Sequence, residues 1–123
     1  MSTILLVEDD KLLGRTLSQY LEKSGLQVFW ATDAVQVYEA LEAKPFDLIL
    51  LDIMLPEVSG LEILQKIKQM PQKRAIPIVM LTNSSDSETM NTATNFGAID
   101  YIVKSNIEFD KLVDLIKTKY LGR

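Results

Sequence analysis

The strongest constraint on the fold is an alternation of short apolar runs with longer segments of helical periodicity. The apolar runs cover residues 4–7, 27–31, 48–51, 78–81 and 101–103. Between them, apolar residues recur at spacings of three and four, as at Leu13, Leu17, Tyr20 and Leu21, which is typical of one apolar helix face. This alternation is typical of βαβ units around a parallel sheet. We therefore predict an α/β fold in which the five runs form the strands.

The apolar runs also indicate how the strands are arranged in the sheet. Residues 4–7, 48–51 and 78–81 are apolar at every position, as expected of central strands that helices cover on both faces. Residues 27–31 begin with Gln27 and are less uniform, which favours an edge strand. Because parallel crossovers are right-handed, we expect a doubly wound sheet with helices on both faces.

Helix starts are predicted by capping-box spacing, in which a polar side chain precedes an acid or amide by three positions. This spacing occurs at Asp33 with Gln36, at Ser59 with Glu62 and at Ser85 with Glu88. The apolar residues of the last helical segment are Phe109, Leu112, Val113, Ile116 and Tyr120.

Length and composition restrict both the domain count and the chemistry. A chain of 123 residues with 47% hydrophobic residues matches one domain spanning 1–123. It contains no cysteine and no histidine, which excludes disulfides, thiolate catalysis, zinc sites made of these residues and a phosphohistidine. Carboxylates, hydroxyls and amines remain for any chemistry.

Charge and hydropathy restrict the partners. Thirteen Lys and Arg against 17 Asp and Glu give a net charge of −4, the wrong sign for holding nucleic acid by counterion release. No apolar run approaches the length of a membrane span, and the first residues lack the pattern of a signal peptide. We expect a cytoplasmic protein without direct nucleic-acid or membrane contacts.

Polar residues suited to a shared site follow four of the five apolar runs, and the run at 27–31, the expected edge strand, is followed by Thr32 and need not contribute. Glu8, Asp9 and Asp10 follow the first, Asp52 the third, Thr82 the fourth and Lys104 the fifth. Each has an ordinary explanation by itself, such as a helix N-cap at Asp9 or Asp10 and a solvated charge at Lys104. In open parallel sheets, however, ligand sites lie beyond the carboxyl ends of the strands. Together these residues predict one polar site at that edge.

The residue types at this predicted site favour phosphoryl chemistry. Carboxylates of Glu8, Asp9 and Asp52 brought together repel one another unless a cation joins them. Oxygen ligands without histidine or cysteine suit Mg²⁺, with Mn²⁺ as a substitute. A carboxylate beside such an ion, with an amine and a hydroxyl opposite, is equipped to attack phosphorus. The predicted product is an aspartyl phosphate at Asp52.

The order and spacing of four motifs resemble the receiver domains of bacterial two-component response regulators, the CheY-like family. The resemblance covers residues 3–121. Its motifs are residues 4–10 (ILLVEDD), residues 47–56 (DLILLDIMLP) with Gly60, residues 77–82 (PIVMLT) and residues 97–104 (GAIDYIVK). The fold that this resemblance implies is a five-stranded parallel sheet in the flavodoxin-like order 2-1-3-4-5.

The resemblance also assigns the acidic residues. Asp52 corresponds to the phosphoacceptor, and the phosphoryl donor is the phosphohistidine of a sensor histidine kinase or phosphotransfer protein, or a small acyl phosphate. Glu8 and Asp9 correspond to the acidic pair that binds Mg²⁺ together with Asp52 and the carbonyl of Met54.

Three further residues match positions that respond to the phosphoryl group in the family, and two of them, Thr82 and Tyr101, form its switch. Thr82 matches the hydroxyl that moves onto the phosphoryl group, Lys104 the amine that pairs with it, and Tyr101 the aromatic side chain that reports the state of Thr82. A downstream protein is expected to bind the face formed by the fourth helix, the fifth strand and the fifth helix.

Two positions depart from the family pattern. Asn83 follows Thr82 where a small residue is usual, and Ser105 follows Lys104 where proline is usual. Because a cis bond before a non-proline residue costs about 3 kcal/mol, we expect the Lys104–Ser105 bond to be trans. We further expect Ser105 or Asn106 to cap the last helix.

Three other functions compete with a phosphorylatable receiver, which is itself not an enzyme. A degenerate receiver would act only as a protein-interaction module. A phosphatase of the haloacid-dehalogenase type needs a second aspartate two positions after Asp52, where this chain has Met54. A flavin-binding protein needs a phosphate-binding loop after the first strand, where Glu8, Asp9 and Asp10 would repel phosphate.

Overall fold

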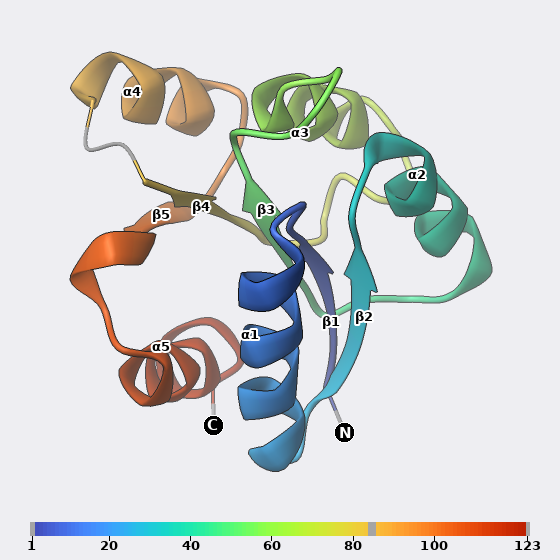
Figure 1. Ribbon diagram of the computed structural model, residues 1–123. Helices are drawn as coiled ribbons and strands as arrows, with labels where there is room; N and C mark the ends of the chain where they lie inside the picture. Colours follow the sequence, from blue (N-terminus) through green and yellow to red (C-terminus); the bar gives the residue numbers. More distant parts are fainter. Residues whose placement is uncertain (1, 84–85, 123) are drawn as a thin grey trace.

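The fold is one parallel sheet between two layers of helices. A computed structural model describes residues 2–83 and 86–122, and within these residues five strands pair in the order β2-β1-β3-β4-β5 (Figure 1). Every neighbouring pair is parallel. The predicted α/β class and strand order are confirmed. The strands are β1 (Thr3–Val7), β2 (Gln27–Ala31), β3 (Leu48–Asp52), β4 (Ile78–Thr82) and β5 (Asp100–Val103).

The helices divide between the two faces of the sheet. Helices α1 and α5 pack on one face, and α2, α3 and α4 pack on the other (Figure 1). No helix within the described residues is both long and apolar enough to cross a bilayer. The helices are α1 (Lys11–Lys23), α2 (Ala34–Ala43), α3 (Gly60–Lys68), α4 (Ser87–Asn95) and α5 (Phe109–Leu115), and a π-helical turn (Ile116–Tyr120) continues α5.

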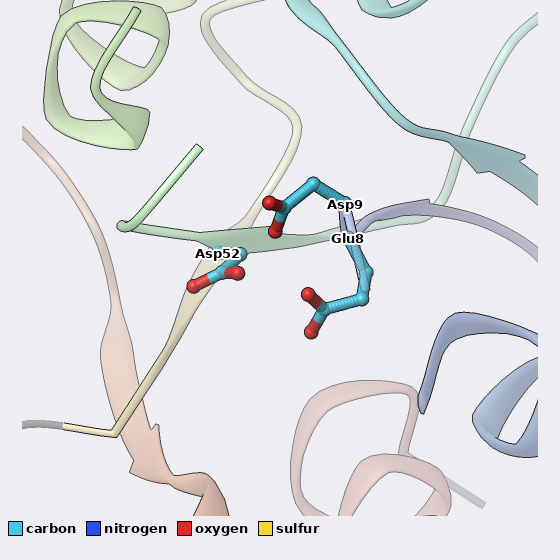
Figure 2. A group of neighbouring side chains, drawn as sticks. All are labelled: Glu8, Asp9 and Asp52. Atoms are coloured by element: carbon cyan, nitrogen blue, oxygen red, sulfur yellow. The ribbon is translucent and has the colours of Figure 1, made fainter. Parts of the chain in front are cut away.

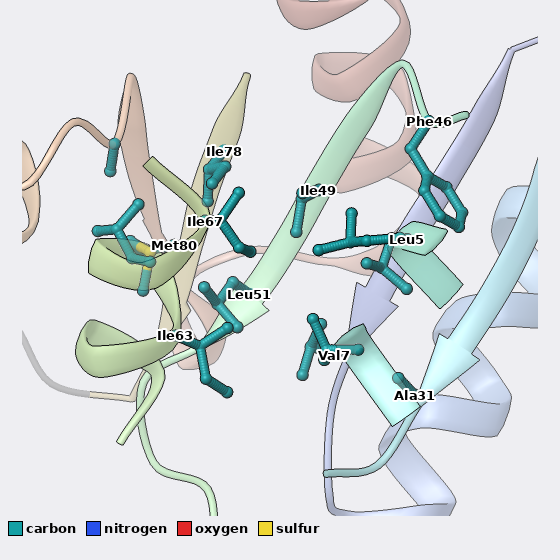
Figure 3. Close-up of a cluster of buried hydrophobic side chains, with 14 of the residues drawn as sticks. Leu5, Val7, Ala31, Phe46, Ile49, Leu51, Ile63, Ile67, Ile78 and Met80 are labelled. Carbon is teal, nitrogen blue, oxygen red and sulfur yellow. The ribbon is translucent and has the colours of Figure 1, made fainter. Parts of the chain in front are cut away.

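The core explains why the predicted central strands are apolar at every position. Alternate residues of β1 and β3 point to opposite faces, so both faces of these strands are buried. Leu5 and Leu51 pack toward α2 and α3, in the cluster of Figure 3. Leu6 and Leu50 pack toward α1 and α5. Strand β2, at the edge, is only partly buried, as predicted.

Two of the predicted helix starts are confirmed and one is wrong. Asp33 Oδ1 accepts the Gln36 amide at 2.9 Å, and Ser59 Oγ accepts the Leu61 amide at 3.1 Å. Helix α4 instead has Asp86 as its N-cap, whose side chain accepts the amide of Glu88. Ser85 itself lies outside the described residues. Aspartate caps a helix as well as serine does, so the neighbouring residue takes the role.

The segment after β5 differs from its prediction in part. The Lys104–Ser105 bond is trans, as expected. Lys104–Asn106 forms a 3₁₀ turn, and Ile107 then returns to an extended conformation before Glu108, the N-cap residue of α5. The N-cap position belongs to Glu108, which makes no side-chain cap hydrogen bond, so the prediction that Ser105 or Asn106 caps this helix is wrong. The 3₁₀ turn ends too far before α5 for either residue to occupy its N-cap position.

Candidate functional site: an acidic cluster at the carboxyl edge of the sheet

Three carboxylates meet where β1 and β3 end. Glu8 and Asp9 follow β1, and Asp52 is the last residue of β3. One oxygen from each side chain lies within 4.8 Å of the other two, and Figure 2 shows the three groups turned toward a common space. Glu8 and Asp52 are buried, while Asp9 is exposed. The predicted acidic residues are therefore brought together, with one side of the cluster open to solvent.

The structure shows which of two neighbouring acids, Asp9 or Asp10, caps α1, a choice that the sequence left open. Asp10, not Asp9, is the N-cap of α1, and its Oδ1 accepts the Leu13 amide at 3.1 Å. The carboxylate of Asp9 is thereby left for the cluster. The Asp10 amide also donates to Glu8 Oε2 at 3.2 Å, which ties the buried acid to the start of the helix.

Lys104 supplies a positive charge from the end of β5. Its ammonium pairs with Glu8 Oε1 and lies 3.0 Å from Asp52 Oδ2. Burial by itself lowers the pKa of Lys104, but the hydrogen bonds to Glu8 and Asp52 outweigh it, so the pKa of this lysine is raised. Lys104 therefore stays protonated between the two carboxylates.

Burial and a neighbouring negative charge both disfavour the ionised form of Glu8. Burial raises the pKa of Glu8 to about 7, although the hydrogen bond from Lys104 acts in the opposite direction. The negative charge of Asp52 raises the pKa of Glu8 further. Three carboxylates share one ammonium, so an added cation would relieve their repulsion.

The main chain after β3 holds Asp52 in place. The amide of Met54 donates to Asp52 Oδ1 at 3.2 Å, while the Met54 side chain is 73% exposed. The amide of Gly60 donates to the carbonyl of Ile53 at 2.8 Å and brings the start of α3 against the end of the strand. Asp52 thus has one carboxylate oxygen on a backbone amide and the other on Lys104.

The two residues assigned to the switch lie at different depths. Thr82 ends β4, is 1% exposed and directly follows Leu81, the cross-strand partner of Asp52. Tyr101 pairs with Met80 in the β4–β5 ladder, and its side chain is 40% exposed. Thr82 therefore lies beside the acidic cluster, whereas the Tyr101 ring lies outside it.

One residue in contact with the cluster was not predicted. The indole Nε1 of Trp30, in β2, donates to the main-chain carbonyl of Glu8 at 2.8 Å. Its ring packs against Gly14 of α1. An isolated glycine inside a helical pattern signals close packing, so Gly14 was the available clue.

Fold and site together define the class of CheY-like signalling domains, which carry acids and a lysine at the carboxyl edge of a flavodoxin-like sheet. The profile of the response regulator receiver domain matches residues 4–117, and the chain belongs to this family. The predicted family is confirmed, and the chain is a receiver domain of two-component response regulators.

Similar proteins include complete response regulators. The transcriptional regulatory protein CrdR of Helicobacter pylori is 37% identical over 114 residues, which cover 93% of this chain and 53% of CrdR. The response regulator ArlR of Staphylococcus saprophyticus is 38% identical over 104 residues, which cover 85% of this chain and 46% of ArlR. The chain therefore spans about half the length of the curated relatives that it matches.

Among solved structures, the Mn²⁺-bound form of the response regulator Rcp1 superposes with a TM-score of 0.86. The two chains are 29% identical, and the match covers 99% of this chain and 96% of Rcp1. Rcp1 is thus known with Mn²⁺ bound, and the cluster of Glu8, Asp9 and Asp52 in this chain is compatible with a site for such an ion.

Proposed function

We propose that Asp52 is the phosphoacceptor of a signalling switch and takes its phosphoryl group from the phosphohistidine of a sensor histidine kinase or phosphotransfer protein. The observation that best supports this proposal is the position of the Asp52 carboxylate. Asp52 is 3% exposed, lies at the carboxyl edge of the sheet and has the Lys104 ammonium 3.0 Å from Oδ2. A carboxylate desolvated beside a fixed ammonium is well placed to attack an electrophilic phosphorus.

The donor set suits a magnesium ion, or manganese in its place. Glu8, Asp9 and Asp52 offer oxygen ligands only, and the carbonyl of Met54 is the proposed fourth protein ligand. The grouping of three carboxylates within 4.8 Å of one another supports this fit, since the cluster gains from an added cation. When bound, the ion neutralises charge on the phosphoryl oxygens during transfer.

The transfer step uses residues that lie at the ends of three strands. An oxygen of Asp52 attacks phosphorus, an O–P bond forms, and the P–N bond to the donor imidazole breaks with its electron pair going to nitrogen. Lys104 already contacts Asp52 and pairs with the negative phosphoryl oxygens that arrive there. The hydroxyl of Thr82, buried at the end of β4, then donates a hydrogen bond to a phosphoryl oxygen.

The proposed output is a population shift of one surface. Movement of Thr82 vacates space into which the exposed ring of Tyr101 turns, and this changes the face formed by α4, β5 and α5. Ile99, which precedes β5, is 54% exposed and adds apolar area to that face. A downstream protein that prefers one of the two surface states is the expected partner.

The site favours this function over a phosphatase. A phosphatase of the haloacid-dehalogenase type needs a proton donor two residues after the nucleophile, and Met54 carries none. The buried Asp52 with its ammonium partner also favours a phosphorylatable domain over a degenerate one. We therefore propose a signalling role without turnover of a released substrate.

Incubation with acetyl phosphate and Mg²⁺, followed by intact-mass analysis, tests the proposal. The wild-type chain should gain the mass of one phosphoryl group, and Asp52→Asn should gain none. Asp47→Asn is the matched control, because Asp47 lies at the opposite end of the same strand and accepts the amide of Thr3. Full phosphorylation of Asp52→Asn would overturn the assignment, as would the absence of any mass gain in the wild type.

A further inference from the structure

The edge strand β2 reaches the acidic cluster through one side chain. Trp30 pairs with Leu6 in the β1–β2 ladder, and its ring packs on the face that carries α1 and α5. From there its Nε1 donates to the carbonyl of Glu8 at 2.8 Å. A strand that contributes no residue to the cluster therefore contacts the main chain that carries two of its acids.

The indole of Trp30 provides a hydrogen bond to Glu8, the residue after β1, where the ladder between β1 and β2 ends. Val7 and Ala31 are the last paired residues, and the amide of Glu8 still donates to the carbonyl of Ala31 at 3.0 Å. Beyond this point the chain turns away, because Asp33 caps α2. A buried carbonyl needs a donor, and Trp30 supplies it. Both main-chain polar groups of Glu8 are thus held by consecutive residues of β2.

Gly14 makes room for this arrangement. A Cβ at Gly14 would lie 2.3 Å from Cε2 and Cζ2 of Trp30 and 2.5 Å from its Nε1. Any larger residue would push the indole away from the carbonyl of Glu8. The ring is therefore held between α1 and the end of β1. These two elements flank the segment that carries Asp9.

The position of Asp9 depends on this main chain. Glu8 and Asp52 have their carboxylates fixed by Lys104, whereas no hydrogen bond to the Asp9 carboxylate occurs within residues 2–83 and 86–122. Its place in the cluster follows from the backbone at Glu8 and from the Asp10 cap of α1. A donor that fixes the Glu8 carbonyl therefore restrains the most weakly held of the three acids.

We propose that Trp30 is a positioning residue for the acidic cluster, and that its indole N–H sets the affinity of Glu8, Asp9 and Asp52 for a divalent cation. This inference rests on the metal site proposed above. Polar groups that orient metal ligands from outside the coordination shell commonly change metal affinity without contacting the ion.

Trp30→Phe removes the N–H and keeps an aromatic ring. We expect Mn²⁺ affinity, measured by electron paramagnetic resonance of the free ion, to fall about tenfold, the lower end of the range for such groups. In the metal-free protein, hydrogen exchange of the Asp10 amide should accelerate more than exchange in β3 or β4. Phe29→Leu is the matched control, since Phe29 is the preceding residue of β2 and packs toward Phe46 on the other face.

Gly14→Ala tests the same contact from the helix. Alanine ordinarily favours a helix over glycine, yet here it should weaken Mn²⁺ binding by displacing the indole. In the Trp30→Phe background, Gly14→Ala should cause little further loss of affinity, because the donor is already gone. Equal and additive losses would contradict the proposed coupling.

The outcomes separate this inference from the metal site itself. If the wild type binds Mn²⁺, Asp9→Asn weakens binding and Trp30→Phe binds like the wild type, the role of Trp30 is overturned and the metal site stands. If Phe29→Leu weakens binding as much as Trp30→Phe, the effect is loss of packing in β2 and the inference is again overturned. If the wild type binds no Mn²⁺, both proposals fail.

Discussion

The ammonium of Lys104 lies 3.0 Å from Asp52 Oδ2 while it also pairs with Glu8, so one cation from the end of β5 serves two buried carboxylates. These carboxylates come from β1 and β3, and Asp9 adds a third negative group at their exposed side. Repulsion between these carboxylates therefore destabilises the metal-free protein. Stability in the absence of metal should depend on the protonation of Glu8.

Glu8→Gln should remove a specific pH dependence of stability. The pKa of Glu8 is raised from 4.5 to about 7 by burial, so the folded state binds more protons than the unfolded state between these values. The free energy of unfolding that Glu8 contributes is thus present at low pH and is lost as pH rises toward 7. In EDTA, urea unfolding should show a loss on the order of 2 kcal/mol that Glu8→Gln abolishes.

The control for this prediction is Glu22→Gln, on the exposed side of α1, which should leave the pH profile unchanged. Mg²⁺ competes with the proton on Glu8, so the rise in Tm that Mg²⁺ produces should be larger above pH 7 than below it. A wild-type profile that matches Glu8→Gln at every pH would contradict the prediction.

Thr82→Ala should separate phosphorylation from the surface change. The variant keeps Asp52 and Lys104, so acetyl phosphate should still modify it. Without the hydroxyl, phosphorylation should shift amide resonances near Asp52 but not those of α4, β5 and α5, which should move in the wild type. Thr82→Ser restores the hydroxyl and should restore the distant shifts. Distant shifts of wild-type size in Thr82→Ala would refute the coupling through this side chain.

The central strands β1, β3 and β4 were predictable to within one residue at each end because burial on both faces leaves a continuous apolar run. The start of α4 was not, since Ser85 and Asp86 are both good caps and the sequence does not rank them. The 3₁₀ turn that ends at Asn106 begins at Lys104, whose side chain makes a tertiary contact with Glu8. Local signals cannot place such a boundary.

The acids of the candidate site were predictable because parallel strands deliver their terminal residues to one edge. Glu8, Asp9 and Asp52 meet for this reason. The contact of Trp30 with Glu8 was not predictable, because neither residue carries a motif for it and the chain between them forms a whole helix. Gly14 indicates close packing against α1, but nothing in the sequence identifies Trp30 as the neighbour or the Glu8 carbonyl as its acceptor.

Tyr120→Phe should weaken the attachment of the chain's last helical turn to the sheet. Asp100 begins β5, and its Oδ2 accepts the Tyr120 hydroxyl at 2.7 Å and the Lys119 ammonium at 2.8 Å. Loss of the partly buried hydroxyl bond to a charged acceptor should cost about 1 to 2 kcal/mol in urea unfolding. Lys119→Met is the comparison, and it should cost about 0.5 kcal/mol or less because this lysine is 58% exposed.

The same contact should weaken in acid. Burial raises the pKa of Asp100, but the hydrogen bonds from Lys119 and Tyr120 outweigh it, so the pKa lies below its usual value. The stabilisation is therefore present above the unfolded-state pKa and is lost as pH falls through the folded-state value. The difference between wild type and Tyr120→Phe should shrink in acid, and a constant difference would argue that Asp100 is not the relevant acceptor.

Gly60→Ala should damage both stability and phosphorylation, because Gly60 lies where α3 starts against the end of β3. A Cβ at this position would lie 2.0 Å from the carbonyl oxygen of Asp52 and 2.8 Å from Ile53 Cα, and backbone atoms cannot move aside as a flexible side chain does. We expect a loss of about 2 to 3 kcal/mol in the free energy of unfolding, as for other overpacked sites.

Gly25→Ala isolates the steric origin of this effect. Gly25 has φ +95° with nothing within 4 Å of an added Cβ, so alanine there meets backbone strain but no clash. Its cost should be about 1 kcal/mol, and acetyl phosphate should modify Asp52 in this variant as in the wild type. In Gly60→Ala the displaced Asp52 main chain should slow phosphorylation even where the protein remains folded. Equal phosphorylation rates in the two variants would mean that the close approach of α3 does not position Asp52.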